Sequence, residues 1–113
     1  MNFTEYQQST RATAIYPGAT LGDLDAVAYL TLGLTGEAGE IANKVKKVIR
    51  DGGGIISDDR RGEVVKEIGD VLWYLARLTD ELGFYLEDIA DANIEKLNDR
   101  RDRGVLQGSG DNR

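Results

Sequence analysis

The chain of 113 residues contains neither cysteine nor histidine. Without cysteine there is no disulfide framework, no zinc–thiolate site and no cysteine nucleophile. Without histidine, the commonest acid–base group at neutral pH and the usual ligand of transition metals are missing. Any chemistry must therefore depend on carboxylates, lysine, arginine, hydroxyl groups and metal-bound water.

Long hydrophobic runs and an excess of positive charge are also missing. The apolar clusters are short and interrupted, so we expect no signal peptide, no membrane-spanning segment and a cytoplasmic location. The net charge of −6 argues against binding to nucleic acid or to anionic membranes.

A single proline favours helices over a fold of strands and turns. The length indicates one domain. A hydrophobic content of 41% suffices for a core, although a chain this short gains stability from oligomerisation. We predict an all-α domain over residues 1–103, followed by a Gly-rich, polar tail over residues 104–113.

Apolar residues that recur at three- and four-residue steps predict four helices. Polar capping residues open the first three of them, and stretches rich in glycine or proline separate these three. The predicted helices run from residue 2 or 4 to about 13, from 23 to about 49, from 57–59 to about 82, and from 87 or 88 to about 101.

The third predicted helix is apolar on two sides. One arc carries Val64, Ile68, Val71, Leu75 and Leu78, and the other side carries Trp73, with Val65, Leu72 and Ala76 between them. A helix that is apolar on two sides is buried on two sides, whereas so small a domain has one interior. We therefore expect the second face of this helix to contact another subunit.

Two pairs of acidic residues lie within these helices, Glu37-x-x-Glu40 in the second and Glu67-x-x-Asp70 in the third. Residues three apart project from the same side of a helix, and each pair borders its apolar stripe. Four carboxylates facing one groove require a positive charge between them, and a hard divalent cation such as Mg²⁺ suits oxygen ligands. A solvated acidic face is the alternative, because single pairs of this kind are common on helix surfaces.

Basic and amide side chains on the fourth predicted helix are candidates for contact with an anionic substrate. Asn93, Lys96 and Arg100 share one face, with spacings of i, i+3 and i+7. Lysine and arginine can hold phosphate oxygens, the arginine in a bidentate manner. A solvated basic stripe is the alternative reading. Lys44 lies four residues after Glu40, which predicts an ordinary surface ion pair.

The acidic pairs, separated by 26 residues, resemble the signature of the MazG-like family of all-α nucleoside triphosphate pyrophosphohydrolases. The sequences around Gly36-Glu37-Ala38-Gly39-Glu40 and around Glu67-Ile68-Gly69-Asp70, and the element Asn93-Ile94-Glu95-Lys96, are similar to that family. The resemblance implies an α-helical bundle that forms a tight homodimer or a dimer of dimers. It also implies that Glu37, Glu40, Glu67 and Asp70 bind Mg²⁺ or Mn²⁺.

The implied reaction is hydrolysis of a nucleoside triphosphate, most often a deoxynucleotide, to the monophosphate and pyrophosphate. The resemblance assigns Asn93 to the sugar, Lys96 and Arg100 to the phosphates, and a closing role to the tail. Glu37 or Glu40 would be the catalytic base, and the sequence leaves the choice between them open. Trp73 and the adjacent tyrosine are either core residues or a stacking surface for the base.

Two other functions are weighed against this one. The first is phosphoribosyl-ATP pyrophosphohydrolase, which shares the carboxylate arrangement and differs in its substrate. The second is a non-catalytic, acidic helical dimer that serves as an adaptor. Hydrolysis of a panel of nucleotides separates the first from a MazG-like enzyme, and pyrophosphate release that depends on Mg²⁺ dismisses the second.

Overall fold

The computed structural model describes residues 1–113, which are helical throughout apart from their turns, loops and tail, with no β-strand. The helices are α1 (Phe3–Thr10), α2 (Leu24–Asp51), α3 (Asp58–Glu81) and α4 (Leu86–Asp102), and a 3-10 turn, η1 (Arg11–Thr13), continues α1. The predicted all-α fold with four helices is confirmed. None of the helices combines the length and the apolar character needed to cross a membrane.

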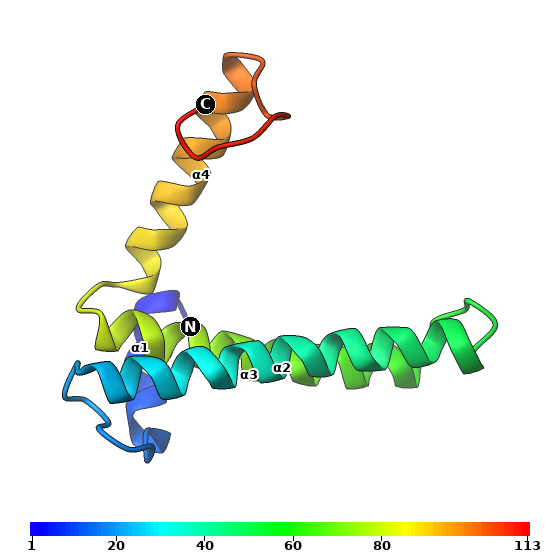
Figure 1. Ribbon diagram of the computed structural model, residues 1–113, viewed down its shortest axis with the longest axis horizontal. Helices are drawn as coiled ribbons and strands as arrows, with labels where there is room; N and C mark the ends of the chain where they lie inside the picture. Colours follow the sequence, from blue (N-terminus) through cyan, green and yellow to red (C-terminus); the bar gives the residue numbers. More distant parts are fainter.

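Helices α2 and α3 form a long antiparallel hairpin, α1 crosses it near one end, and α4 projects away from that end (Figure 1). The chain has a radius of gyration of 17.0 Å, whereas a compact domain of this length has about 13 Å. The four helices of a single chain therefore do not close into a bundle around one core.

Each of the first three helices begins at a side chain that accepts a hydrogen bond from the backbone of the first turn. Asn2 accepts from the N–H of Glu5, Asp23 caps α2, and Ser57 caps α3. These caps agree with the sequence, and the observed helix ends lie within a few residues of the predicted ones.

The buried core is small and lies where α1 and the following loop cross the hairpin. Tyr16, Ala26 and Leu30 form its centre, and Trp73 and Leu78 of α3 pack against them. The ring of Tyr16 also meets that of Trp73 edge to face, with centroids 6.2 Å apart. The loop between η1 and α2 is thus anchored on α3 by an aromatic contact.

A buried polar network also fixes this loop. The fully buried Arg77 donates two hydrogen bonds to the hydroxyl of Tyr16, which in turn donates to Glu81. The Glu81 carboxylate also accepts from the backbone N–H groups of Thr20 and Gly22, at 2.6 and 2.8 Å. Burial tends to raise the pKa of Glu81, but these hydrogen bonds and the Arg77 charge outweigh it and hold the pKa below its usual value.

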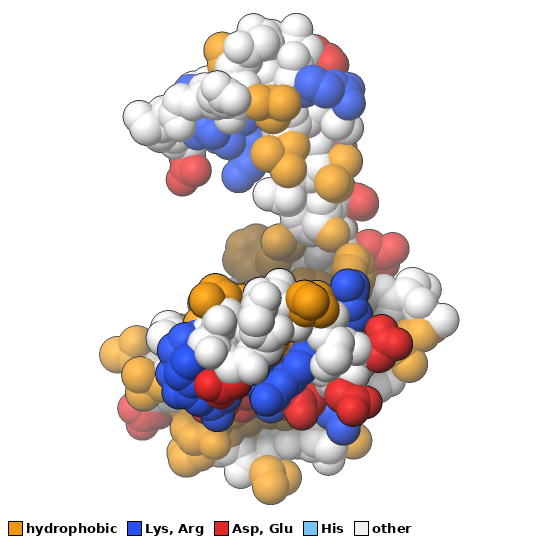
Figure 2. All heavy atoms as spheres, turned by 90° about the vertical axis from the view of Figure 1, so that its right-hand side faces the viewer, with side chains coloured by type: hydrophobic (Ala, Val, Ile, Leu, Met, Phe, Trp, Pro, Cys, Tyr) orange, Lys and Arg blue, Asp and Glu red, His pale blue; other side chains and the backbone are white.

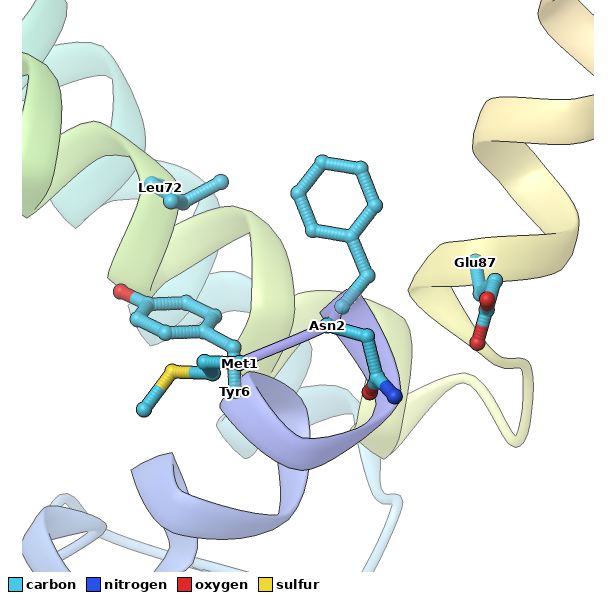
Figure 3. Close-up of a pocket in the computed structure, with 6 residues that line it drawn as sticks. Met1, Asn2, Tyr6, Leu72 and Glu87 are labelled. Atoms are coloured by element: carbon cyan, nitrogen blue, oxygen red, sulfur yellow. The ribbon is translucent and has the colours of Figure 1, made fainter.

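The base of α4 is held by Gln7 of α1, whose side chain is almost completely buried. Its amide nitrogen donates to the carbonyl of Phe84, and its amide oxygen accepts from the N–H of Leu86. Beside this joint, an apolar groove lies between Tyr6 of α1 and Leu72 of α3, with Glu87 of α4 at its margin (Figure 3). The hydrogen bonds of Gln7 with Phe84 and Leu86 set the direction in which α4 leaves the hairpin.

Large apolar side chains remain exposed on the hairpin and on α4 (Figure 2). An open groove on α2 is lined by Ala38, Ile41, Ala42, Val45 and Ile49. On α3, Ile68 and Leu75 of the first arc are exposed. The expectation that the Trp73 side would contact another subunit is wrong for Trp73 and Ala76, because both pack within the chain. The chain exposes 7810 Å², whereas a compact monomer of this mass exposes about 6,100 Å².

Candidate metal centre

Three carboxylates from α2 and α3 converge at the middle of the hairpin. Glu37 of α2 and Glu67 and Asp70 of α3 each place a carboxylate oxygen within 4.8 Å of the other two. Glu37 and Glu67 are half-buried, and Asp70 is exposed. The arrangement follows from the antiparallel pairing of two helices whose acidic residues border the contact surface between them.

The charges of this carboxylate cluster repel one another. The pKa of Glu37 is raised, first by burial and then by the charge of Asp70 and the contact with Glu67. A divalent cation relieves such repulsion, and a set of carboxylate oxygens open to solvent on one side is the kind of ligand set that Mg²⁺ and Mn²⁺ prefer. The residues present therefore fit a hard divalent cation.

An open pocket of about 410 Å³ adjoins the cluster. Glu37 and Asp70 line one part of it, and Thr13, Trp73 and Tyr74 line the rest. The indole N–H of Trp73 donates to the hydroxyl of Thr13 at 2.8 Å, and the rings of Trp73 and Tyr74 meet edge to face. The two aromatic residues thus pack within the protein and also line the pocket, so both readings made from the sequence remain compatible with their positions.

One glycine beside the cluster permits a close approach of the two helices. A Cβ built on Gly33 would lie 2.1 Å from the ring of Tyr74, so the ring occupies the space of a side chain at this position. The glycines next to the acidic pairs, Gly36, Gly39 and Gly69, face open space, with no atom within 4 Å of a built Cβ. The close approach of the two helices therefore explains why glycine occupies position 33. Within a single chain it does not explain the other three glycines.

Glu40 and Lys44 do not form the surface ion pair that the sequence predicts. Glu40 is exposed and does not belong to the group of three converging carboxylates. Lys44 reaches across to α3, where its Nζ lies 3.1 Å from a carboxylate oxygen of Glu67. The expected surface pair of Glu40 with Lys44 is therefore replaced by an ion pair between the two helices.

The three candidate substrate contacts on α4 are not brought to the carboxylate cluster within one chain. Asn93 and Lys96 line a shallow pocket of about 310 Å³ on α4, which projects away from the hairpin (Figure 1). Arg100 is nearly buried, and its guanidinium donates to the carbonyl of Asp111 at 2.6 Å. The tail thus folds back on α4 and covers this arginine.

Sequence reasoning missed two residues near the cluster that come from the N-terminal segment. Burial, and then the charge of Asp70, raise the pKa of Tyr6 of α1. Thr13 of η1 holds the Trp73 indole at the pocket. Neither residue belongs to a recognisable motif, and only the crossing of α1 over the hairpin brings them there.

The helical hairpin, its carboxylate cluster and the adjoining pocket define an all-α protein with a candidate site for a divalent cation. Comparison with known families gives the class: the model described as "MazG nucleotide pyrophosphohydrolase domain" matches residues 26–105. The chain belongs to the MazG family, whose members are nucleotide pyrophosphohydrolases. The match includes both acidic pairs and the whole of α4.

One relative is similar over the full length of both proteins. The "Gene 37 protein" of Mycobacterium phage L5 is 51% identical over 116 aligned positions, which cover 100% of each chain. No solved structure matches the chain.

Proposed function

We propose that this protein is a nucleoside triphosphate pyrophosphohydrolase that depends on Mg²⁺ or Mn²⁺ and converts a deoxynucleoside triphosphate to the monophosphate and pyrophosphate. The observation that carries the proposal is the convergence of Glu37, Glu67 and Asp70 within 4.8 Å beside an open pocket. Membership of the MazG family supports the same reaction.

Glu37, Glu67 and Asp70 would hold the cation, and Glu40 would join them by a rotation of its exposed side chain. A bound divalent cation supplies Lewis acidity toward phosphate oxygens and lowers the pKa of water. Glu37 is the better placed base of the two candidates, because it lines the pocket, whereas Glu40 lies outside the cluster.

In the proposed step, a water oxygen attacks phosphorus and the bond from that phosphorus to the pyrophosphate leaving group breaks. The water proton passes to a carboxylate oxygen of Glu37. Asn93 would contact the sugar, and Lys96 and Arg100 would neutralise the phosphates. Arg100 would have to exchange the Asp111 carbonyl for a phosphate oxygen.

We further propose that two copies of the chain form the active enzyme. The accessible area exceeds that of a compact monomer by about 1,700 Å², whereas a standard interface removes about 800 Å² from each partner. The exposed apolar residues of α2 and α3, such as Val45 and Ile68, offer a surface for this contact. A partner would also bring a second α4, with its Lys96, into the neighbourhood of the hairpin.

The test is pyrophosphate release from every ribo- and deoxynucleoside triphosphate and from phosphoribosyl-ATP, with and without Mg²⁺, for the wild type and Asp70→Asn. Turnover that needs the cation and is lost in Asp70→Asn supports the proposal. Turnover of phosphoribosyl-ATP alone assigns the related activity instead. An absence of turnover with every substrate, together with an absence of cation binding, supports a non-catalytic role.

A further inference from the structure

The ion pair of Lys44 with Glu67 links the two helices of the hairpin, whereas the buried pairs of Arg77 with Asp80 and Glu81 lie within α3. It joins α2 to α3, and both side chains are largely covered, with 26% and 16% of their surface exposed. The neighbouring pairs Arg50–Asp51 and Arg60–Glu63 connect residues of the same helix, and their side chains are at least 40% exposed. The Lys44 ammonium is therefore a fixed part of the cluster's surroundings.

This ammonium lies on a carboxylate that belongs to the candidate cation site. Glu67 has one oxygen 3.1 Å from Lys44 Nζ, and its carboxylate also lies within 4.8 Å of Glu37 and Asp70. The three carboxylates and the one ammonium together carry a charge of −2. A divalent cation that enters the cluster must therefore approach a positive charge and compete with it for Glu67.

A unit charge and a divalent cation several ångströms apart repel each other appreciably even when solvent screens them. The repulsion lowers the affinity of the cluster for a cation alone. A triphosphate that arrives with its cation brings negative charge that compensates the same ammonium. The arrangement thus favours loading of the cation together with the nucleotide over loading of the cation by itself.

We propose that Lys44 is a positioning residue that acts as a built-in competitor for the cation, holding Glu67 and keeping the affinity for a free divalent cation low until a triphosphate binds. This inference rests on the proposed function, because it takes the carboxylate cluster as the cation site. It assigns to Lys44 a role that neither the acidic pattern nor the family match contains.

The test measures Mn²⁺ binding in the absence of nucleotide, by calorimetry and by the electron paramagnetic resonance signal of free Mn²⁺. Lys44→Met is expected to bind Mn²⁺ roughly tenfold more tightly than the wild type, because one positive charge beside the site is removed. Lys44→Arg keeps the positive charge and is expected to bind Mn²⁺ with the wild-type affinity. Lys46→Met removes one charge from the same helix at an exposed position on another groove, and serves as the matched control.

Unchanged or weaker Mn²⁺ binding by Lys44→Met overturns the role of Lys44, since a purely structural ion pair would produce one of these results. If circular dichroism shows that Lys44→Met has lost helicity, Lys44→Gln replaces it under the same expectation. Asp70→Asn is measured in parallel. If the wild type and Asp70→Asn bind Mn²⁺ equally, or if Lys44→Met also shows no binding, the cation site itself fails, and this inference fails with it.

Discussion

The ring of Tyr74 on α3 fills the space that a side chain of residue 33 on α2 would occupy. A Cβ at Gly33 would lie 2.1 Å from Cε1 and 2.4 Å from Cζ of that ring. Such distances cannot be relieved by the rotation of a flexible chain end, because the ring packs against the buried core. Gly33 therefore sets the spacing of the hairpin one helical turn from Glu37.

Gly33→Ala should consequently destabilise the protein, by about 1–3 kcal/mol from overpacking, although alanine is the better helix former. We expect a lower midpoint of thermal unfolding and weaker cation binding, since Glu37 would be pushed away from α3. Gly39→Ala is the matched control, because its added Cβ meets no atom within 4 Å. An equal or higher midpoint for Gly33→Ala would show that the hairpin spacing is not set by this contact.

In the absence of a cation, repulsion among the three carboxylates of the cluster should lower the stability of the folded protein. Asp70→Asn removes one of the charges that raise the pKa of Glu37, so the variant without cation should unfold at a temperature equal to or above that of the wild type. Added Mg²⁺ or Mn²⁺ should raise the midpoint of the wild type and leave that of Asp70→Asn unchanged. Differential scanning calorimetry with and without cation measures both effects, and Asp91→Asn, exposed on α4, is the control.

The sequence predicts the helices and the convergence of three of the four residues in its acidic pairs, because both depend on local spacing. Caps such as Asp23 and Ser57 and apolar steps of three and four residues are readable along the chain. The positions of Glu37 and Asp70 follow from helical periodicity together with antiparallel pairing of neighbouring helices. The convergence of these two residues can therefore be predicted from spacing within two helices that follow one another in the sequence.

Contacts that depend on how one helix crosses another could not be predicted. The choice of Lys44 between Glu40 and Glu67 depends on the register of the hairpin, and the spacing of four residues favours the wrong partner. The direction of α4 depends on the hydrogen bonds of Gln7 with the backbone at its base. Neither feature has a periodic or compositional signal.

The buried network around Glu81 predicts an acid sensitivity of the fold. Its carboxyl pKa is lower in the folded protein than the usual value, so its contribution to the free energy of unfolding is present above that usual value and is lost as the pH falls through the lowered one. Glu81→Gln should cost about 2 kcal/mol at pH 7, because the hydrogen bonds to charge are weakened. The difference between wild type and variant should shrink below about pH 4.

Thermal unfolding of the two proteins between pH 3 and 7, at one protein concentration, measures this difference. Glu95→Gln removes a carboxylate from an exposed position on α4 and should leave the unfolding midpoint unchanged across the range. A constant difference between wild type and Glu81→Gln at every pH would mean that the loop contacts do not depend on the charge of Glu81.

The exposed apolar face of α3 predicts self-association. Half of the Ile68 surface is exposed, and glutamate at this position would place a charge in the proposed subunit contact. Ile68→Glu should shift the molecular mass in solution toward that of a single chain, as measured by sedimentation equilibrium. Lys66→Gln produces the same change of net charge at an exposed polar position of α3 and should leave the mass unchanged. A monomeric wild type would contradict the proposed dimer directly.

The distance of α4 from the carboxylate cluster leads to the last prediction. Asp70 lies in the cluster and Lys96 lies on the projecting helix, so one active site would combine Asp70 of one chain with Lys96 of another (Figure 1). Asp70→Asn and Lys96→Met should each have little activity alone. After subunit exchange, half of randomly paired dimers are mixed, and each mixed dimer contains one site with both native residues. The mixture should therefore recover roughly a quarter of the wild-type turnover.

Pyrophosphate release measures the recovery, and native mass spectrometry confirms the exchange. A mixture of Asp70→Asn with Glu67→Gln, whose changes both fall in the cluster of their own chain, should recover nothing, because every site in it lacks one carboxylate. Confirmed exchange without recovery in the first mixture would mean that Lys96 does not serve a site shared between two chains.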